Sequence, residues 1–181
     1  MSKQDTPARY KRRLTVTHDS IIDVDFGHLE AEGDLIITAE VHSSSGIVYN
    51  VVIEIDGFHS ELRKNFRHTK VLHKSVEKAL RSTIKSKELS VDCTCPDFKY
   101  RYAYVASVNG YKSGNQEDRP AKITNPNNKG RACKHVISTV SNISQWINEL
   151  RSMIVQELRN DPTILPEYTP PKVKRIIKRK R

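Results

Sequence analysis

The spacing of the cysteines constrains this chain more than any other feature. The 181 residues include three cysteines, which fall in two short stretches, VDCTCPDF at 91–98 and RACKHV at 131–136. Cys93 and Cys95 lie two residues apart in a strand-like segment, so their side chains point to the same face. Cys133 and His135 repeat this spacing where an apolar helical pattern begins. Three thiolates and one imidazole make the closed donor set of a structural zinc site.

Three other roles were weighed against zinc for these residues. A redox pair of Cys93 and Cys95 leaves Cys133 and His135 without a function. A nucleophilic dyad of Cys133 and His135 is disfavoured, because groups two residues apart serve one ion more readily than each other and no oxyanion site is evident. The third alternative is that the three cysteines have no shared role and occur in this pattern by chance. We therefore expect one structural Zn²⁺ held by Cys93, Cys95, Cys133 and His135.

The residues around the first cysteine pair have two interpretations each. Asp97, and equally Asp92, is a candidate acceptor for the free N–H of His135, although Asp97 is as well placed to cap a helix. The following aromatic and basic residues could stack on single-stranded nucleic acid. We favour a core role for Phe98 and Tyr102, with the neighbouring cations in solvent. The residues concerned are Phe98, Lys99, Tyr100, Arg101, Tyr102 and Tyr104.

The order C-x-C, 37 intervening residues, then C-x-H resembles the SWIM zinc finger over residues 90–140. The CTCPDF opening and the CKHV close, which runs straight into an apolar helix, are similar to that family in detail. The resemblance implies a ββα unit with these four zinc ligands and a role in binding DNA or protein. The aromatic DFKYRYAY segment and the Asn- and Pro-rich insert look like the SWIM-type proteins of tailed bacteriophages, several of which are regarded as virion components.

Hydrophobic periodicity predicts strands first and helices later. The segments LTVT, SIIDVDF, GDLIITAEVHS and GIVYNVVIEID, within 14–56, alternate in the manner of an antiparallel meander. From about residue 69 to 87, apolar residues recur every four positions, which predicts an amphipathic helix. LSVDC reads as a short strand that leads into Cys93.

Two further helices are expected around a long loop. The first spans 97–108, and residues 109–130 form a loop that is either a binding segment or a tolerated surface insertion. The second spans 134–159. Its apolar positions alternate steps of four and three, which predicts packing against another helix in this chain or in a neighbouring copy. These positions are Val136, Val140, Ile143, Ile147, Leu150 and Ile154.

Together these patterns predict an α+β fold: a small antiparallel sheet, about three helices, one Cys3His zinc site, and basic N- and C-terminal extensions. Residues 1–13 form a basic arm. Residues 14–160 form a single domain that contains the SWIM-like finger at 90–140 and its insert at 109–130. Residues 161–181 form a Pro-rich hinge and a basic tail.

The formal charge of +10 is concentrated at the two ends of the chain. Residues 172–181 contribute +7 and residues 1–13 contribute +4, which leaves −1 for the rest. Such ends bind polyanions without reading sequence, through release of counterions. An amphipathic arm against an acidic protein or membrane surface is the alternative. The cations concerned are Lys172, Lys174, Arg175, Lys178, Arg179, Lys180 and Arg181 in the tail, and Lys11, Arg12 and Arg13 in the arm.

No catalytic pattern is evident: the sequence has no Gly-rich phosphate loop, no carboxylate cluster and no nucleophile with a positioned base. It also lacks a long apolar run and a secretory signal, so we expect the protein in the host cytoplasm and in the virion. We expect a non-enzymatic, zinc-stabilised assembly module of a tailed-phage head or neck, which contacts DNA and other virion proteins and could self-associate through 134–159. The alternative is an intracellular SWIM-type DNA-binding accessory factor in recombination or replication.

Overall fold

A four-stranded antiparallel sheet lies at the centre of the chain, for which a computed structural model describes residues 20–29, 34–43, 45–85 and 89–169. Strands β1 (Ile21–Leu29), β2 (Leu35–His42), β3 (Val48–Ile55) and β4 (Leu89–Cys93) lie side by side in sequence order. Each pairs with the next in antiparallel fashion. The predicted meander is therefore confirmed, while the LTVT segment at 14–17 lies outside the described residues.

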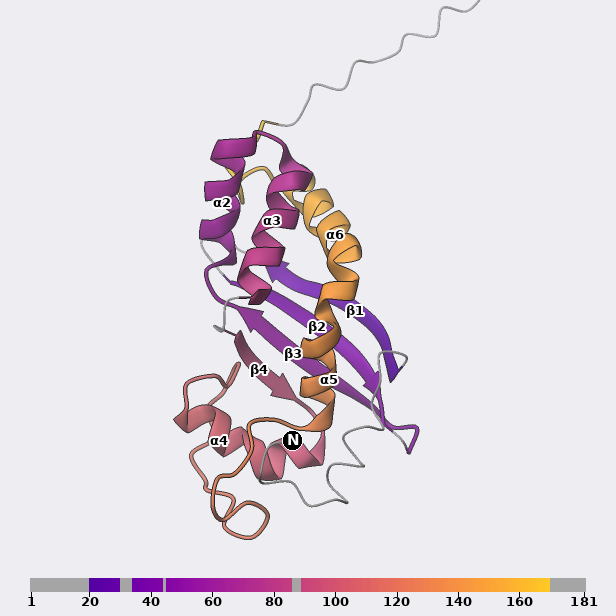
Figure 1. Cartoon of the computed structure of the whole chain (residues 1–181), viewed down its shortest axis with the longest axis vertical. Coiled ribbons are helices and arrows are strands. Elements are labelled where there is room, and N and C mark those ends of the chain that lie inside the picture. The colour runs from indigo at the N-terminus through magenta and orange to yellow at the C-terminus, as the bar shows by residue number, and fades with distance from the viewer. Residues whose placement is uncertain (1–19, 30–33, 44, 86–88, 170–181) are drawn as a thin grey trace, which may run out of the picture.

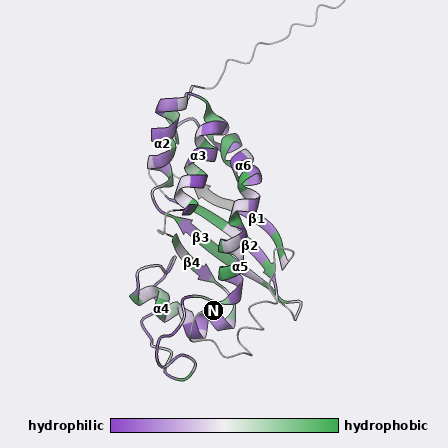
Figure 2. Cartoon of the chain, in the orientation of Figure 1, coloured by the Kyte–Doolittle hydropathy of each residue, from purple (hydrophilic) through white to green (hydrophobic). Residues whose placement is uncertain are grey.

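One face of this sheet forms the core. Alternate residues of β2 and β3 are buried, from Leu35 and Ile37 on β2 to Ile53 and Ile55 on β3. Helices cross that face: α5 contacts β3 and β4, and α6 contacts β1 (Figure 1). Hydrophobic residues follow the central strands, and hydrophobic and hydrophilic residues alternate along the helices (Figure 2). The α+β class predicted from periodicity is thus confirmed.

A helical hairpin follows β3. Helix α2 (Phe58–Thr69) runs to Lys70, which adopts a left-handed conformation with φ of 53°, and α3 (Leu72–Lys85) returns beside α2. The helix predicted at 69–87 corresponds to α3. The sequence interpretation assigned no element to 57–68, where α2 buries Phe58, Leu62 and Phe66 at intervals of four residues.

The single helix predicted at 134–159 is interrupted in the structure. Helix α5 (Lys134–Asn142) leads through a 3₁₀ turn (Ile143–Trp146) into α6 (Ile147–Asn160). Its apolar positions Ile147, Leu150 and Ile154 are buried, and α6 packs on α3 of the same chain. The predicted helix partner therefore lies within this chain. Self-association through 134–159 stays a prediction.

Residues 161–169, named here the C-terminal strap, fold back along α2. Ile164 and Leu165 are buried, and the ring of Tyr168 meets the ring of Phe66 edge-on with centroids 6.0 Å apart. The first part of the predicted Pro-rich hinge is thus packed on the body of the protein. None of the helices among the described residues has the length and apolar character needed to cross a membrane.

Candidate metal centre

The first pair of candidate ligands lies at the end of β4. Cys93 is the last residue of that strand and pairs with Val51 of β3. The chain then turns at Thr94, whose N–H donates to the Asn50 carbonyl and whose hydroxyl accepts the Asn50 N–H, both at 3.0 Å. Cys95 follows this turn, and its Sγ accepts the N–H of Phe98 at 3.3 Å. Backbone hydrogen bonds thus hold both thiols toward the interior.

The second pair lies at the start of α5. Cys133 is the extended residue that precedes the helix, with φ −72° and ψ 168°, and His135 lies in the first helical turn. The helix that the apolar pattern predicts here therefore begins between the two candidate ligands. This change from extended to helical backbone brings together two side chains that a regular helix would place on different faces.

The four side chains meet in one buried cluster. One ligand atom from each of Cys93, Cys95, Cys133 and His135 lies within 4.8 Å of the other three, and each residue is at most 4% exposed. Zinc–sulfur bonds of about 2.3 Å in a tetrahedron place sulfurs roughly 3.8 Å apart. The cluster therefore has the size and the donor set of a four-coordinate metal site.

The imidazole of His135 provides an independent test of fit. It is 3% exposed, and neither Nδ1 nor Nε2 has a hydrogen-bond partner. Leaving a buried nitrogen unsatisfied costs about 1–3 kcal/mol, so such groups are rare in folded proteins. A metal ion bonded to one nitrogen removes much of this cost. The ring of Tyr49 packs on the imidazole with centroids 5.0 Å apart, a contact that the sequence pattern had not indicated.

The crowding of three thiols separates their proton affinities. Hydrogen bonding to Cys133 and Cys95, then burial, raises the pKa of the Cys93 thiol, whereas hydrogen bonds from Cys133 and Cys93 lower the pKa of Cys95. A hydrogen bond with Cys93 lowers the pKa of Cys133, but a hydrogen bond with Cys95, together with burial and the charge of Cys95, outweighs it and raises this pKa to about 12. Three thiolates in this space repel one another, and a divalent cation offsets that repulsion.

The Asp97 carboxylate does not serve His135 in this structure. It accepts a hydrogen bond from the Arg101 guanidinium at 2.6 Å, and it makes no capping hydrogen bond to the helix that follows. Asp92 is also engaged, with Lys112 Nζ at 3.0 Å and the Cys93 N–H at 2.8 Å. The expected hydrogen bond from the His135 N–H to either aspartate is therefore absent, because nearer donors hold both carboxylates.

The aromatic segment follows the first pair of candidate ligands, and the Phe98 N–H donates to Cys95 Sγ. It begins as a π-helix (Phe98–Tyr102) and continues as α4 (Ala103–Val108), where a single helix was predicted. Phe98 and Tyr102 are buried in the core, as favoured from the sequence, whereas Tyr100 is 60% exposed. The alternative interpretation, in which all four aromatic residues form a stacking surface, is therefore wrong, because Phe98 and Tyr102 are buried.

The insert at 109–130 contains no regular helix or strand but is anchored at several points. The Val91 N–H donates to the Tyr111 carbonyl at 2.8 Å, and the Ser113 N–H donates to the Val91 carbonyl at 3.0 Å, which adds a short bridge beyond β4. The Asn125 side chain is buried and bonds the backbone of Arg101 and of Lys129. The insert is thus a loop with an internal framework of hydrogen bonds.

The predicted binding residues of the two ends, in 1–13 and 172–181, lie outside the described residues. No family model, no curated protein and no solved structure matches the chain. The fold and the site define its class: an α+β chain with a buried Cys3His cluster that is compatible with one zinc ion.

Proposed function

We propose that this chain is a non-enzymatic binding module of the SWIM type, stabilised by one structural Zn²⁺. The observation that carries the proposal is the buried Cys3His cluster with its unpartnered imidazole. Four protein donors complete a tetrahedral zinc shell and leave no position for a reactive water, which is the arrangement of structural rather than catalytic zinc. The similarity of the C-x-C and C-x-H motifs to the SWIM family supports the same assignment.

The zinc would join parts of the chain that are distant in sequence. Cys93 and Cys95 lie at the end of β4, whereas Cys133 and His135 begin α5 after an insert of 37 residues. Closing the loop of 37 residues between Cys95 and Cys133 costs conformational entropy, and a metal bond offsets that cost. The ion would thereby hold the edge of the sheet against α5. The surface segments between the two motifs would then keep a fixed position for binding a partner.

For the partner, we propose nucleic acid and neighbouring proteins within a tailed-phage particle. The seven cations of 172–181 and the cationic arm at 1–13 support contact with a polyanion, because clustered Lys and Arg gain affinity by releasing counterions. The similarity of the long insert and aromatic segment to phage SWIM-type proteins supports the virion setting.

The tail is tested by deletion. The full chain and a chain lacking residues 172–181 are titrated into a labelled DNA duplex at several salt concentrations. We expect the deletion to abolish salt-sensitive binding. Unchanged affinity and salt dependence in the shortened chain would contradict a role for the tail.

The proposal that the protein is a component of the virion is tested by mass spectrometry of purified phage particles. Peptides of this chain in the particles, at a constant ratio to the major head proteins, are expected. Its absence from particles, together with co-purification with recombination enzymes from infected cells, would instead favour the intracellular DNA-binding accessory factor.

A further inference from the structure

The near-neutral body of the chain consists of two oppositely charged regions. Residues 14–56 contain nine Asp and Glu and no Lys or Arg. The hairpin region 57–85 contains eight Lys and Arg and two Glu, a formal charge of +6. The charge between the two ends is therefore small only because these regions cancel. The α2–α3 hairpin is a third basic part of the protein, and it lies within the described fold.

The cations of α3 form one stripe. Lys74, Lys78, Arg81 and Lys85 follow one another at steps of four, three and four residues, so they share a face of the helix. All four are exposed, while Leu72, Val76 and Leu80 are buried on the opposite side. Eleven residues at 1.5 Å per residue give this stripe a length of about 16 Å.

Few acids neutralise this stripe. Glu77 bonds Arg81 and Arg151, each at 3.0 Å, and these guanidinium groups lower the pKa of its carboxyl, so it stays ionised and engaged. Lys74, Lys78 and Lys85 form no ion pair among the described residues. Their ammonium groups are therefore free to meet a negatively charged partner.

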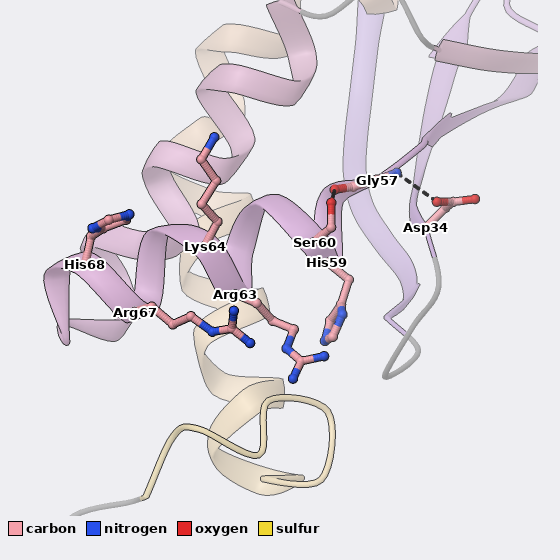
Figure 3. Close-up of a pocket in the computed structure, with 8 residues that line it drawn as sticks. All are labelled: Asp34, Gly57, His59, Ser60, Arg63, Lys64, Arg67 and His68. Atoms are coloured by element: carbon pink, nitrogen blue, oxygen red, sulfur yellow. Dashed lines mark hydrogen bonds between the residues drawn. The ribbon is translucent and has the colours of Figure 1, made fainter.

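The C-terminal strap is joined to α2 by hydrogen bonds between charged side chains. Glu167 Oε1 accepts hydrogen bonds from Arg63 at 2.9 Å and from Arg67 at 3.2 Å. The described chain ends at Thr169, three residues before the first tail cation, Lys172. Figure 3 shows Arg63 and Arg67 reaching from α2 toward the strap. Lys64 and His68, with them, line a surface cavity of about 580 Å³.

We propose that the exposed cations of the α2–α3 hairpin form a surface that binds the phosphate backbone of nucleic acid. The inference rests on the proposed binding function and adds a site within the folded body. Bound in this way, a duplex would meet the end of the molecule opposite the metal cluster (Figure 1). The hairpin stripe would contact successive phosphates along the backbone.

The composition of the hairpin favours nucleic acid over an acidic protein. Protein interfaces bury an apolar centre, whereas backbone contacts to nucleic acid need little more than cations. The exposed large hydrophobic residues of the described chain all lie outside the hairpin, so it offers no apolar anchor to a protein partner. They are Ile22, Ile47, Val48, Tyr100, Val108, Ile123 and Ile137.

The acidic strands would orient the bound nucleic acid. Asp23 of β1 pairs directly with Glu40 of β2, and both side chains are exposed, as is Asp25. The negative potentials of these neighbouring carboxylates add together, so this face of the sheet repels phosphates. A duplex is therefore attracted to the hairpin and excluded from the exposed sheet face.

The test compares two triple variants with the same loss of charge. The first is Lys74→Gln, Lys78→Gln and Lys85→Gln on the hairpin. The second, a matched control, is Lys99→Gln, Lys122→Gln and Lys129→Gln, three exposed lysines of the π-helix and the insert. All six lysines are exposed, and glutamine has a helix propensity similar to that of lysine at the α3 positions. Both variants should therefore keep the melting temperature and metal content of the parent chain.

Binding of each chain to a labelled DNA duplex is followed by fluorescence anisotropy between about 50 and 200 mM salt. The hairpin variant should reduce the slope of log K against log salt by about 2 to 3, since each lost phosphate contact removes about 0.9. The control should change the slope by less than about 1. An unchanged slope in the hairpin variant, or a larger change in the control, would overturn the proposal.

Two further arms separate this inference from the proposed function. Deletion of 172–181 is combined with each triple variant. If only the deletion weakens binding, the hairpin site is wrong and the tail remains a binding element. If only the hairpin variant weakens binding, the hairpin site stands and the tail is not a binding element. Poly-glutamate is then used as a competitor, and it should displace the duplex poorly. Displacement as efficient as by unlabelled DNA of equal charge would contradict nucleic acid as the partner.

Discussion

Two buried histidines show how the environment of a residue decides its role. His59 is 5% exposed, and its Nε2 lies 2.6 Å from the Ile164 carbonyl of the strap. His135 is 3% exposed, and both of its ring nitrogens lack a hydrogen-bond partner. A protein hydrogen bond therefore accounts for the burial of His59. A bond to a metal ion would account for the burial of His135, because the three thiols of a possible metal site lie beside it.

This difference predicts opposite outcomes for the same substitution. His135→Ala should lower the zinc content well below one ion per chain and reduce thermal stability, since zinc binding and folding are coupled. His59→Ala should keep the zinc and lose only a buried hydrogen bond, about 1–3 kcal/mol of unfolding free energy. Metal analysis and thermal melting of both variants check this. Equal zinc contents would contradict the assignment of His135 as a ligand.

Cys95→Ala tests the same cluster from the other motif. It removes a metal donor and the sulfur that accepts the Phe98 N–H. Residues 89–142 should then lose protection from hydrogen exchange, because the zinc no longer joins β4 to α5. The α2–α3 hairpin, at the other end of the molecule, serves as the internal reference and should stay protected. Exchange protection of 89–142 equal to that of the parent chain would argue against a structural site.

Among the elements, those with clean periodicity were predictable. The strands β2 and β3 alternate regularly, and α3 repeats its apolar residues every four positions. The break between α5 and α6 could not be foreseen, because the apolar stripe continues through the 3₁₀ turn, where Ile143 is buried like its neighbours. Helix α2 was overlooked even though Phe58, Leu62 and Phe66 mark one face of it.

The meeting of Cys93, Cys95, Cys133 and His135 was also predictable, but its surroundings were not. The four candidate ligands follow from two i, i+2 spacings. The engagement of Asp97 depends on Arg101, four residues later, which competes for the carboxylate along the helical segment. The contact of Tyr49 with His135 joins residues far apart in sequence and required the sheet register to be known.

The packing of α6 on α3 predicts a large cost for one core substitution. Leu150 is fully buried, so Leu150→Ala should lower the free energy of unfolding by about 2–5 kcal/mol through the cavity it leaves. Ile137 on α5 is 38% exposed, and Ile137→Ala should cost clearly less. Both variants should retain zinc. Equal destabilisation of the two variants in urea titrations would contradict the packing of Leu150 between α6 and the core.

The C-terminal strap depends on the charge of Glu167. The Arg63 guanidinium, backbone hydrogen bonding and Arg67 lower the pKa of this carboxyl to about 2 from an ordinary 4.5. Its stabilising effect is therefore complete above about pH 4.5 and is lost only as the pH falls toward 2.

Glu167→Gln should cost about 1 kcal/mol, given the partial exposure of these ion pairs, and should increase protease cleavage within 161–169. The difference in melting temperature from the parent chain should stay constant between about pH 6 and pH 8, since the carboxyl is ionised throughout. A difference that changes across this range would mean that another group controls the strap.

At the scale of the whole molecule, the Cys3His cluster and the α2–α3 hairpin lie at opposite ends of the fold. Figure 1 shows β4, α4 and the start of α5 at one end and the α2–α3 loop at the other. The sheet and α6 connect the two ends. Zinc would therefore stabilise the framework, and the charged hairpin and tail would provide the contacts.

The central claim, one structural zinc ion held by Cys93, Cys95, Cys133 and His135, is tested most directly by metal analysis. The protein is purified under reducing conditions, and its metal content is measured by inductively coupled plasma mass spectrometry. The account predicts one zinc ion per chain. Reduced, folded protein that contains no zinc, and that takes up none when zinc is supplied, would contradict it.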